Sequence, residues 1–324
     1  MKIRSEHIVK WTENCLTIRK AKKRITAEKN KKKGPVREWV EAILWAVVIV
    51  FIINQFIFQL YQIPSSSMEN TLLIKDRVFV NKAIFGPEIY PDGPKILDFN
   101  DPKRDDIIIF QNPNYVSRGP VFDVMNRIIY MITLSLVNID KDENGNPRAQ
   151  LYVKRAVGYP GDTITFDQGN ILIRPIGYRG SVDEETFRAD AGLTVFHKRT
   201  FTDEDYTAFT AYAQMQAYEK EGIQVPVDLQ KLANSSSSSL KDYYHIYKAY
   251  YTMRAKIDPQ DDTVRSELTR YTNGFYLPAG YILPIGDNRD NSGDGRYFGP
   301  IPAKEMLGKA IFRFWPISRV GILH

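Results

Sequence analysis

Residues Ala42 to Tyr61 form a run of twenty residues without a formal charge. At 1.5 Å per residue, a helix of this length covers roughly 30 Å, which is the thickness of the hydrocarbon core of a bilayer. The run therefore predicts a transmembrane helix within an anchor segment at 39–61. A cleavable signal peptide is the alternative, but the apolar region is too long for one and no small-x-small cleavage site follows it.

The distribution of charge gives this anchor a direction. The whole chain has a net charge of +6, yet residues 1–38 contain 13 Lys/Arg and four acids, so the basic excess lies in this tail. Basic flanks stay on the cytoplasmic side of a membrane and also suit anionic lipid headgroups. We therefore expect a basic cytoplasmic tail over 1–38 and export of everything after Tyr61. No nucleic-acid partner is expected, because the basicity is confined to one end.

Short apolar segments separated by turns follow the anchor. Residues 76–82 alternate in part with period two, and 106–110 form a continuous apolar run typical of a buried strand. This pattern predicts a β-rich body, and no glycine-rich phosphate loop follows any of the strands. Cys15 is the only cysteine and the four histidines show no ligand spacing, so neither a metal nor a cofactor is expected.

A serine turn comes directly after the apolar run. The sequence Ile63-Pro64-Ser65-Ser66-Ser67-Met68 is a poor helix start, because Pro64 fixes its own φ and restricts Ile63 to extended geometry. We expect a tight, exposed turn in which one hydroxyl is a nucleophile. A serine-rich linker is the alternative, and the stretch alone does not exclude it.

A strand with two cations is the second informative stretch. Residues 151–162 are apolar and β-branched around Lys154 and Arg155, and they close on a Pro-Gly turn. Alternation puts the two cations on opposite faces, so that one can point inward while the other meets solvent. A charge on an exposed edge is the ordinary alternative. Since the chain has a serine turn and no suitable histidine, Lys154 is the candidate general base.

The third stretch, residues 286–299, is rich in Asp, Asn, Gly and Ser. Such a composition predicts a loop with many side-chain-to-backbone hydrogen bonds, held rigid by pairs of carboxylates and arginines. A surface loop or a calcium loop is the alternative, although the terminal Glu of the EF-hand pattern is missing.

Together the three stretches resemble the bacterial type I signal peptidases, the Ser/Lys leader peptidase family. The serine box corresponds to 63–73, the lysine box to 152–162 and the last box to 286–296, and segments 105–110 and 311–316 are also similar. The order of the boxes and the anchor immediately upstream agree with the family. The chain departs from frequent family residues at Ser66, Asn70, Asp105 and Gly295.

The resemblance implies roles for individual residues. Ser67 would be the nucleophile and Lys154 its base, while Ser65 would add a hydroxyl to the oxyanion hole beside the Ser67 N–H. Ser292 would orient the lysine. Structural support would come from Asp287, Arg289, Asp294 and Arg296. Substrate pockets would be lined by Ile63, Pro64, Met68, Leu72, Tyr152 and Val153.

The implied activity is removal of signal peptides from exported preproteins, with cleavage after small residues in an Ala-x-Ala-like pattern. The protein would be a single-pass protein of the bacterial cytoplasmic (inner) membrane, with its catalytic domain on the outer face. Preproteins, membrane lipids and the secretion translocon would be its partners. One alternative is a membrane-tethered, non-catalytic β-rich binding module. The other, a Ser/Lys self-cleaving repressor, should carry a DNA-binding helix pair where this chain has its anchor.

Two regions lie outside the resemblance. We assign the β-rich catalytic domain to 62–174 plus 272–324, in a signal-peptidase-like β fold, and a partly helical insertion domain to 175–271. Residues 128–137 are apolar but too short to span a bilayer, and we interpret them as a buried or interfacial segment.

The insertion contains two amphipathic stretches with helical spacing. Their apolar positions are Tyr206, Phe209, Ala213 and Ala217 in the first, and Leu240, Tyr243, Tyr247 and Tyr250 in the second. Residues 202–205 provide a capping signal, Gly222 a stop, and 235–239 a flexible linker. The tyrosine stripe predicts core packing rather than a binding surface.

Overall fold

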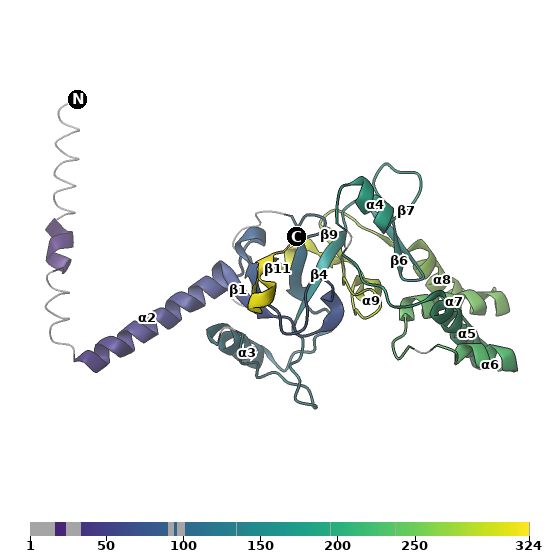
Figure 1. Cartoon of the computed structure of the whole chain (residues 1–324), viewed down its shortest axis with the longest axis horizontal. Coiled ribbons are helices and arrows are strands. Elements are labelled where there is room, and N and C mark those ends of the chain that lie inside the picture. The colour runs from purple at the N-terminus through teal and green to yellow at the C-terminus, as the bar shows by residue number, and fades with distance from the viewer. Residues whose placement is uncertain are drawn as a thin grey trace, which may run out of the picture. The chain divides into compact units, whose positions relative to one another are not determined.

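The computed structural model describes residues 17–23, 34–89, 94–95, 101–133, 135–194, 196–236 and 238–323. Its contacts divide the chain into two compact units, residues 1–52 and residues 53–324. Most of the basic tail lies outside the described residues. The site discussed below belongs entirely to the second unit, which consists of two antiparallel sheets with helices (Figure 1).

Helix α2 (Pro35–Phe56) contains most of the apolar run and is followed by strand β1 (Phe58–Gln62). The prediction that the helix continues to Tyr61 is wrong. Strand β1 pairs with β2 (Arg77–Asn81), and its residues Gln59 and Tyr61 point into the core. The last residues of the apolar run therefore form a strand of the sheet instead of extending the helix. Among the described residues, no helix combines the length and the apolar character that a membrane span requires.

The larger sheet has the strand order β1-β2-β11-β3-β4-β9-β10, with β12 added on β11. Its remaining strands are β3 (Ile107–Gln111), β4 (Leu151–Gly158), β9 (Tyr281–Ile285), β10 (Ile301–Pro302), β11 (Met306–Trp315) and β12 (Gly321–Ile322). Residues 107–110 are all buried, which confirms the expected buried strand. Strand β4 lies inside the sheet between β3 and β9, and this position brings it under the serine turn.

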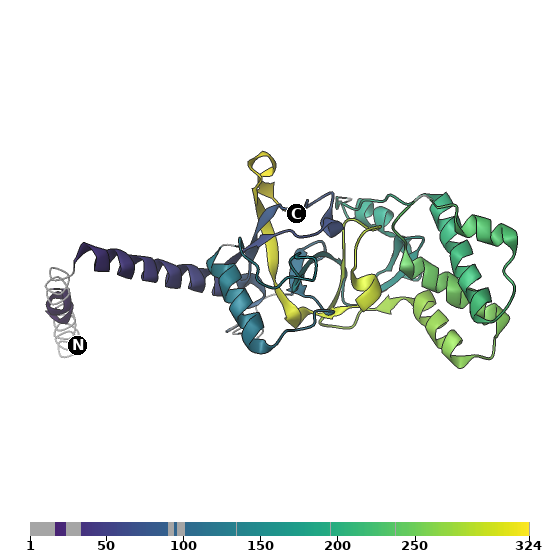
Figure 2. The same ribbon diagram turned by 90° about the horizontal axis from the view of Figure 1, so that it is seen from below.

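The smaller sheet has the order β7-β6-β5-β8, made by β5 (Thr163–Asp167), β6 (Asn170–Arg174), β7 (Val182–Asp183) and β8 (Phe275–Tyr276). The helices of the second unit after β3 are α3 (Pro120–Ile132), α4 (Glu184–Asp190), α5 (Asp203–Lys220), α6 (Val227–Ala233), α7 (Tyr243–Ile257), α8 (Asp262–Asn273) and α9 (Gly295–Phe298). Short 3₁₀ turns occur at η1 (Ser66–Met68), η2 (Ala83–Phe85), η3 (Ala303–Glu305) and η4 (Ile317–Arg319). Figure 2 shows α5 to α8 gathered together, because α5 packs on α6 and α7, and α7 on α8.

Helix α5 forms as the sequence predicts. Thr202 and Asp205 make a reciprocal capping box at its start, and the chain leaves the helix at Gly222, which has a φ of +69°. The apolar positions Tyr206, Phe209, Ala213 and Ala217 are all buried.

Helix α7 does not bury the predicted stripe. Tyr243 and Tyr247 are 50% and 44% exposed, while Tyr244 and Ile246 are buried in their place. The stripe prediction is wrong for Tyr243 and Tyr247, because α5 and α8 cover a face of α7 that contains Tyr244 and Ile246. Tyr250 is the predicted residue that does pack against the cluster formed by α5 and Ile246. Helix α6 was not predicted at all, because its seven residues are too few to show a period.

Arg155 is another departure from expectation. Its side chain is fully buried rather than solvent-facing, as are all residues of β4 from Val153 onward. Both faces of this strand are covered, because it is an interior strand that carries the serine turn on one side and the segment around Phe196 on the other. The alternation of the strand therefore predicted that Lys154 and Arg155 lie on opposite faces, but it did not show that both faces are buried.

Candidate active site

The serine turn is held by the loop that begins at Gly286. Ser67 lies in the 3₁₀ turn η1, and its carbonyl accepts a hydrogen bond from the Asn288 N–H at 3.0 Å. The turn is tight as expected, but the expectation that it is exposed is wrong for Ser67 and Met68, which are buried. The Asn288 amide also donates to the Ser66 carbonyl at 3.2 Å, and the Asn291 amide donates to the Ser66 hydroxyl at 3.0 Å. These bonds fix a turn that Pro64 alone would leave free to move.

Lys154 reaches this turn from the middle of the sheet. Its Nζ lies 2.6 Å from the Ser67 Oγ and 3.2 Å from the Val153 carbonyl oxygen. The lysine side chain is only 2% exposed. Burial lowers the pKa of Lys154 from 10.5 to about 8, although the nearby carboxylates of Asp294 and Asp287 act in the opposite direction.

The other two serines lie close to this pair but differ in their contacts. The Ser65 Oγ is 3.4 Å from the Ser67 Oγ. The Ser292 Oγ is buried and has no hydrogen-bond partner among the described residues, so the predicted bond to Lys154 is not formed. Gly286 lets Ser292 approach, since a Cβ at that position would come within 2.1 Å of the Ser292 Oγ and 2.5 Å of the Ser67 carbonyl oxygen.

The residues predicted as structural supports form buried ion pairs around the turn. Asp287 accepts two hydrogen bonds of 2.8 Å from the Arg155 guanidinium. Arg296 pairs with Asp294 at 2.9 Å, and Asp294 in turn accepts from the Gly286 N–H at 3.0 Å. Burial would raise the pKa of Asp294, but Arg296 holds it below its usual range.

Arg289 anchors the same loop to helix α4. Its guanidinium donates to the Gly286 carbonyl at 3.0 Å and to both carboxylate oxygens of Glu184. Although burial opposes it, pairing with Arg289 and Arg188 lowers the pKa of Glu184 to about 2. Sequence reasoning missed Glu184, because no pattern in its own segment points to a loop 105 positions away.

Arg155 is the other residue that sequence reasoning did not assign to the site. Besides Asp287, its guanidinium donates to the Asp105 carbonyl at 2.9 Å and stacks 3.8 Å from the Phe196 ring centre. The signal that could have identified it is the pair of cations inside an otherwise apolar strand, because a buried cation requires a partner.

A small cavity of about 30 Å³ lies beside the Ser67 hydroxyl. It is lined by Ile63, Pro64, Ser65, Ser67, Met68, Ala149, Leu151, Tyr152, Val153 and Lys154. Leu72 does not line it: that side chain is fully buried in the core, which corrects one predicted pocket residue. Among the described residues, strand β4 pairs with β9 only from Arg155 onward. No described strand pairs with its first residues on that side, although the Leu151 carbonyl accepts from the Tyr61 hydroxyl and the Val153 carbonyl from the Lys154 amine.

Within the described ranges, no cluster of three or more His, Cys, Asp or Glu side chains has a geometry suited to a metal ion. The cavity beside Ser67 presents the Ser67 and Ser65 hydroxyls and the buried Lys154 amine. Such a set can carry out nucleophilic acyl transfer, in which the amine accepts the proton of the hydroxyl.

Comparisons with known proteins agree with this arrangement. The model of the family described as "Signal peptidase, peptidase S26" matches residues 36–315. The chain is 28% identical to a signal peptidase I of Buchnera aphidicola subsp. Baizongia pistaciae over 82% of this chain and 72% of that protein. It is 23% identical to a signal peptidase I of Pseudomonas aeruginosa over 92% of this chain and 82% of that protein. A signal peptidase I of Aquifex aeolicus is 24% identical over 86% of this chain and 84% of its own length.

Proposed function

The chain belongs to the signal peptidase family, peptidase S26, and we propose that it removes signal peptides from preproteins with Ser67 as nucleophile and Lys154 as general base. It is a serine endopeptidase by family. The observation that carries the proposed residue roles is the 2.6 Å separation of the Ser67 Oγ and a buried Lys154 Nζ whose pKa is lowered to about 8. At pH 7 roughly a tenth of such a lysine is neutral and able to accept a proton.

The first half of the reaction forms an acyl-enzyme. The neutral Lys154 amine takes the Ser67 proton while the Ser67 Oγ attacks the scissile carbonyl carbon. The Ser67 N–H and the Ser65 hydroxyl donate to the oxyanion of the tetrahedral intermediate. When the peptide C–N bond breaks, the Lys154 ammonium returns the proton to the leaving amine, which is the new N-terminus of the mature protein.

The second half releases the signal peptide. Lys154, neutral again, takes a proton from a water molecule that attacks the ester carbonyl, and it returns this proton to the Ser67 oxygen as the ester breaks. For Ser292 to orient the amine, its hydroxyl, which has no hydrogen-bond partner among the described residues, would have to turn toward Lys154. The ion pairs of Asp287, Arg289, Asp294 and Arg296 keep the serine turn and the lysine in register.

The substrate is an extended segment with small residues one and three positions before the cut. The small size of the cavity beside Ser67, about 30 Å³, supports this choice. The part of β4 before Arg155 does not pair with β9, so its edge can hydrogen-bond an added peptide strand. Ile63, Pro64, Met68, Tyr152 and Val153 line the pocket.

We further propose that the N-terminal apolar segment attaches the enzyme to the bacterial cytoplasmic membrane as a single-pass anchor. The basic tail would stay in the cytoplasm and the catalytic domain (62–174 plus 272–324) and insertion domain (175–271) would lie on the outer face. The charge asymmetry between residues 1–38 and the rest of the chain supports this direction. Membrane lipids and the secretion translocon would be the partners there.

The deciding experiment incubates the purified full chain with a preprotein and sequences the new N-terminus. Cleavage after an Ala-x-Ala-like sequence is expected, and Ser67→Ala, Lys154→Ala and Lys154→Arg should each abolish it, since a guanidinium does not give up its proton. The non-catalytic binding module is not favoured, but it would be supported if purified chain bound the preprotein without cutting it.

A further inference from the structure

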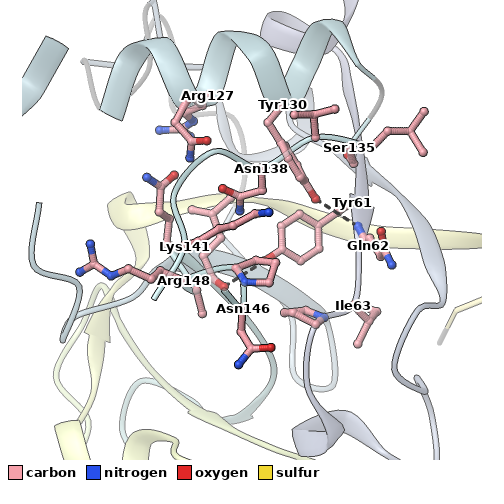
Figure 3. Close-up of a pocket in the computed structure, with 18 of the residues that line it drawn as sticks. Tyr61, Gln62, Ile63, Arg127, Tyr130, Ser135, Asn138, Lys141, Asn146 and Arg148 are labelled. Atoms are coloured by element: carbon pink, nitrogen blue, oxygen red, sulfur yellow. Dashed lines mark hydrogen bonds between the residues drawn. The ribbon is translucent and has the colours of Figure 1, made fainter. Parts of the chain in front are cut away.

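A second, larger cavity of about 680 Å³ adjoins the one at Ser67 (Figure 3). The two cavities share Ile63, Pro64, Ala149 and Leu151 as lining residues, so they are direct neighbours. One wall is β1 with the residues that follow it. The opposite wall comes from α3 and from residues between Ser135 and Gln150. From the apolar stretch of 128–137 it includes Tyr130, Ser135, Leu136 and Val137.

Side chains of this second wall hold the edge of the sheet. Among the described residues, strand β1 is the end strand of the larger sheet and β2 is the one strand that pairs with it. The Ser135 hydroxyl donates to the Leu60 carbonyl, and the Tyr130 hydroxyl accepts from the Gln62 N–H at 3.4 Å. The Tyr61 hydroxyl donates to the Leu151 carbonyl at 3.0 Å. The cavity walls are thus tied to each other by hydrogen bonds before any peptide binds.

The lining of the larger cavity is basic. Its described residues include Lys75, Arg127, Lys141 and Arg148 but no Asp or Glu. The charge of Arg127 is offset by Glu88 at 3.3 Å and that of Arg148 by Asp140 at 3.3 Å. Lys75 and Lys141 are exposed, and neither has an acidic partner in the part of the chain that the structure describes. The remaining polar lining includes the amides Gln59, Gln62, Asn126, Asn138, Asn146 and Gln150.

We propose that this cavity is an additional substrate subsite, which favours acidic over basic side chains in the residues upstream of the two small positions. The inference rests on the proposed function, because it takes the peptide direction from the small pocket beside Ser67. An extended peptide advances about 3.3 Å per residue, so a substrate seated with its third residue in the small cavity enters the larger one from about the fourth residue onward. Lys75 and Lys141 attract an acidic side chain there and repel a basic one.

The test uses the full chain in detergent with three peptides that share one Ala-x-Ala cleavage sequence. They differ only at the fifth residue before the cut, which is Asp, Asn or Lys. Each exposed ionic contact changes binding by roughly twofold to fivefold, so kcat/KM should be about tenfold higher for the Asp peptide than for the Lys peptide. The difference should lie in KM, and it should shrink in 1 M salt, where the Debye length is about 3 Å.

A double variant, Lys75→Gln with Lys141→Gln, should bring the Asp-to-Lys ratio close to one. The matched control removes two lysines that lie away from the cavity, Lys220→Gln with Lys304→Gln, and has the same net charge. This control should keep the ratio of the unmodified chain.

Two results would overturn the subsite: equal kcat/KM for the three peptides, or a ratio that the cavity variant and the control change equally. Failure of the unmodified chain to cleave even the Asn peptide and a preprotein would instead overturn the proposed function. The two failures are therefore distinguishable in one set of assays.

Discussion

Replacement of Lys154 by Met should remove activity and yet stabilise the protein near neutral pH. The lysine side chain is 2% exposed, and burial lowers its pKa from 10.5 to about 8. Met has a similar length and no charge, so it fills the same space without the cost of a buried ammonium.

The sign and size of the effect follow from the two pKa values. Between pH 8 and pH 10.5 the unfolded chain holds a proton on Lys154 that the folded chain has released, so stability rises with pH in this window. Above pH 10.5 the lysine is neutral in both states and the buried charge does not lower the free energy of unfolding. As the pH falls from 10.5 through 8 the free energy of unfolding decreases, and below pH 8 the decrease is complete. A change in pKa from 10.5 to about 8 corresponds to about 3 kcal/mol at pH 7.

The Met variant avoids this loss but gives up the hydrogen bond to the Ser67 Oγ, which is worth about 1 kcal/mol. We therefore expect Lys154→Met to be more stable than the unmodified chain by about 2 kcal/mol at pH 7. The advantage should vanish near pH 10, where the lysine is neutral in the folded state.

Thermal unfolding in detergent at several pH values measures this directly. For a unit of this size, 1 kcal/mol shifts the midpoint by about 2–4 °C, so the variant should melt about 4–8 °C higher at pH 7. In parallel, kcat/KM of the unmodified enzyme should rise with pH through about 8 and then level off, because only the neutral amine is a base.

Two results would refute the reasoning. A Met variant that is destabilised equally at every pH would mean that Lys154 carries no buried-charge penalty. A kcat/KM profile that levels off near pH 6.5 would indicate a histidine-like base instead of this lysine.

Three further predictions follow from the same structure. Ser65→Ala should lower kcat about 10²- to 10³-fold with little change in KM, because it removes one hydrogen-bond donor to the oxyanion. A kcat within twofold of that of the unmodified enzyme would contradict this role of the Ser65 hydroxyl. Arg155→Ala should destabilise the protein by about 3–5 kcal/mol in denaturant titrations, because it leaves the Asp287 carboxylate buried without its cation. Adding Asp287→Asn should recover part of the loss, and an unchanged denaturation midpoint for Arg155→Ala would show that the ion pair is not formed. In a chain that begins at Ile53, the double variant Ile129→Asp with Ile132→Asp should bind anionic vesicles more weakly but still cleave a short peptide. The control Ile223→Asp with Val227→Asp, near the start of α6, should keep its vesicle binding, and equal binding by both variants would mean that the α3 segment does not contact lipid.

Features set by neighbours in sequence could be predicted from the sequence alone. The turn at Ser67, the buried strand at 107–110 and the capping box at Thr202 are all present in the structure. Each depends on interactions within a few residues: the fixed φ of a proline, the period of a strand, or a side chain that satisfies the first N–H groups of a helix. The same holds for the alternation that turned Lys154 and Arg155 to opposite sides of β4.

Features set by distant partners could not be predicted in this way. The buried charge of Arg155 is stabilised by Asp287, which is 132 positions away, and the Glu184 that pairs with Arg289 lies in α4, 105 positions away. The exposed tyrosines of α7 and the end of α2 at Phe56 were equally decided by packing, on α8 in one case and on β2 in the other. Local sequence determines which face a side chain takes, but only the tertiary structure determines what covers that face, and in this protein the covering elements give the lysine its lowered pKa and the serine its fixed position.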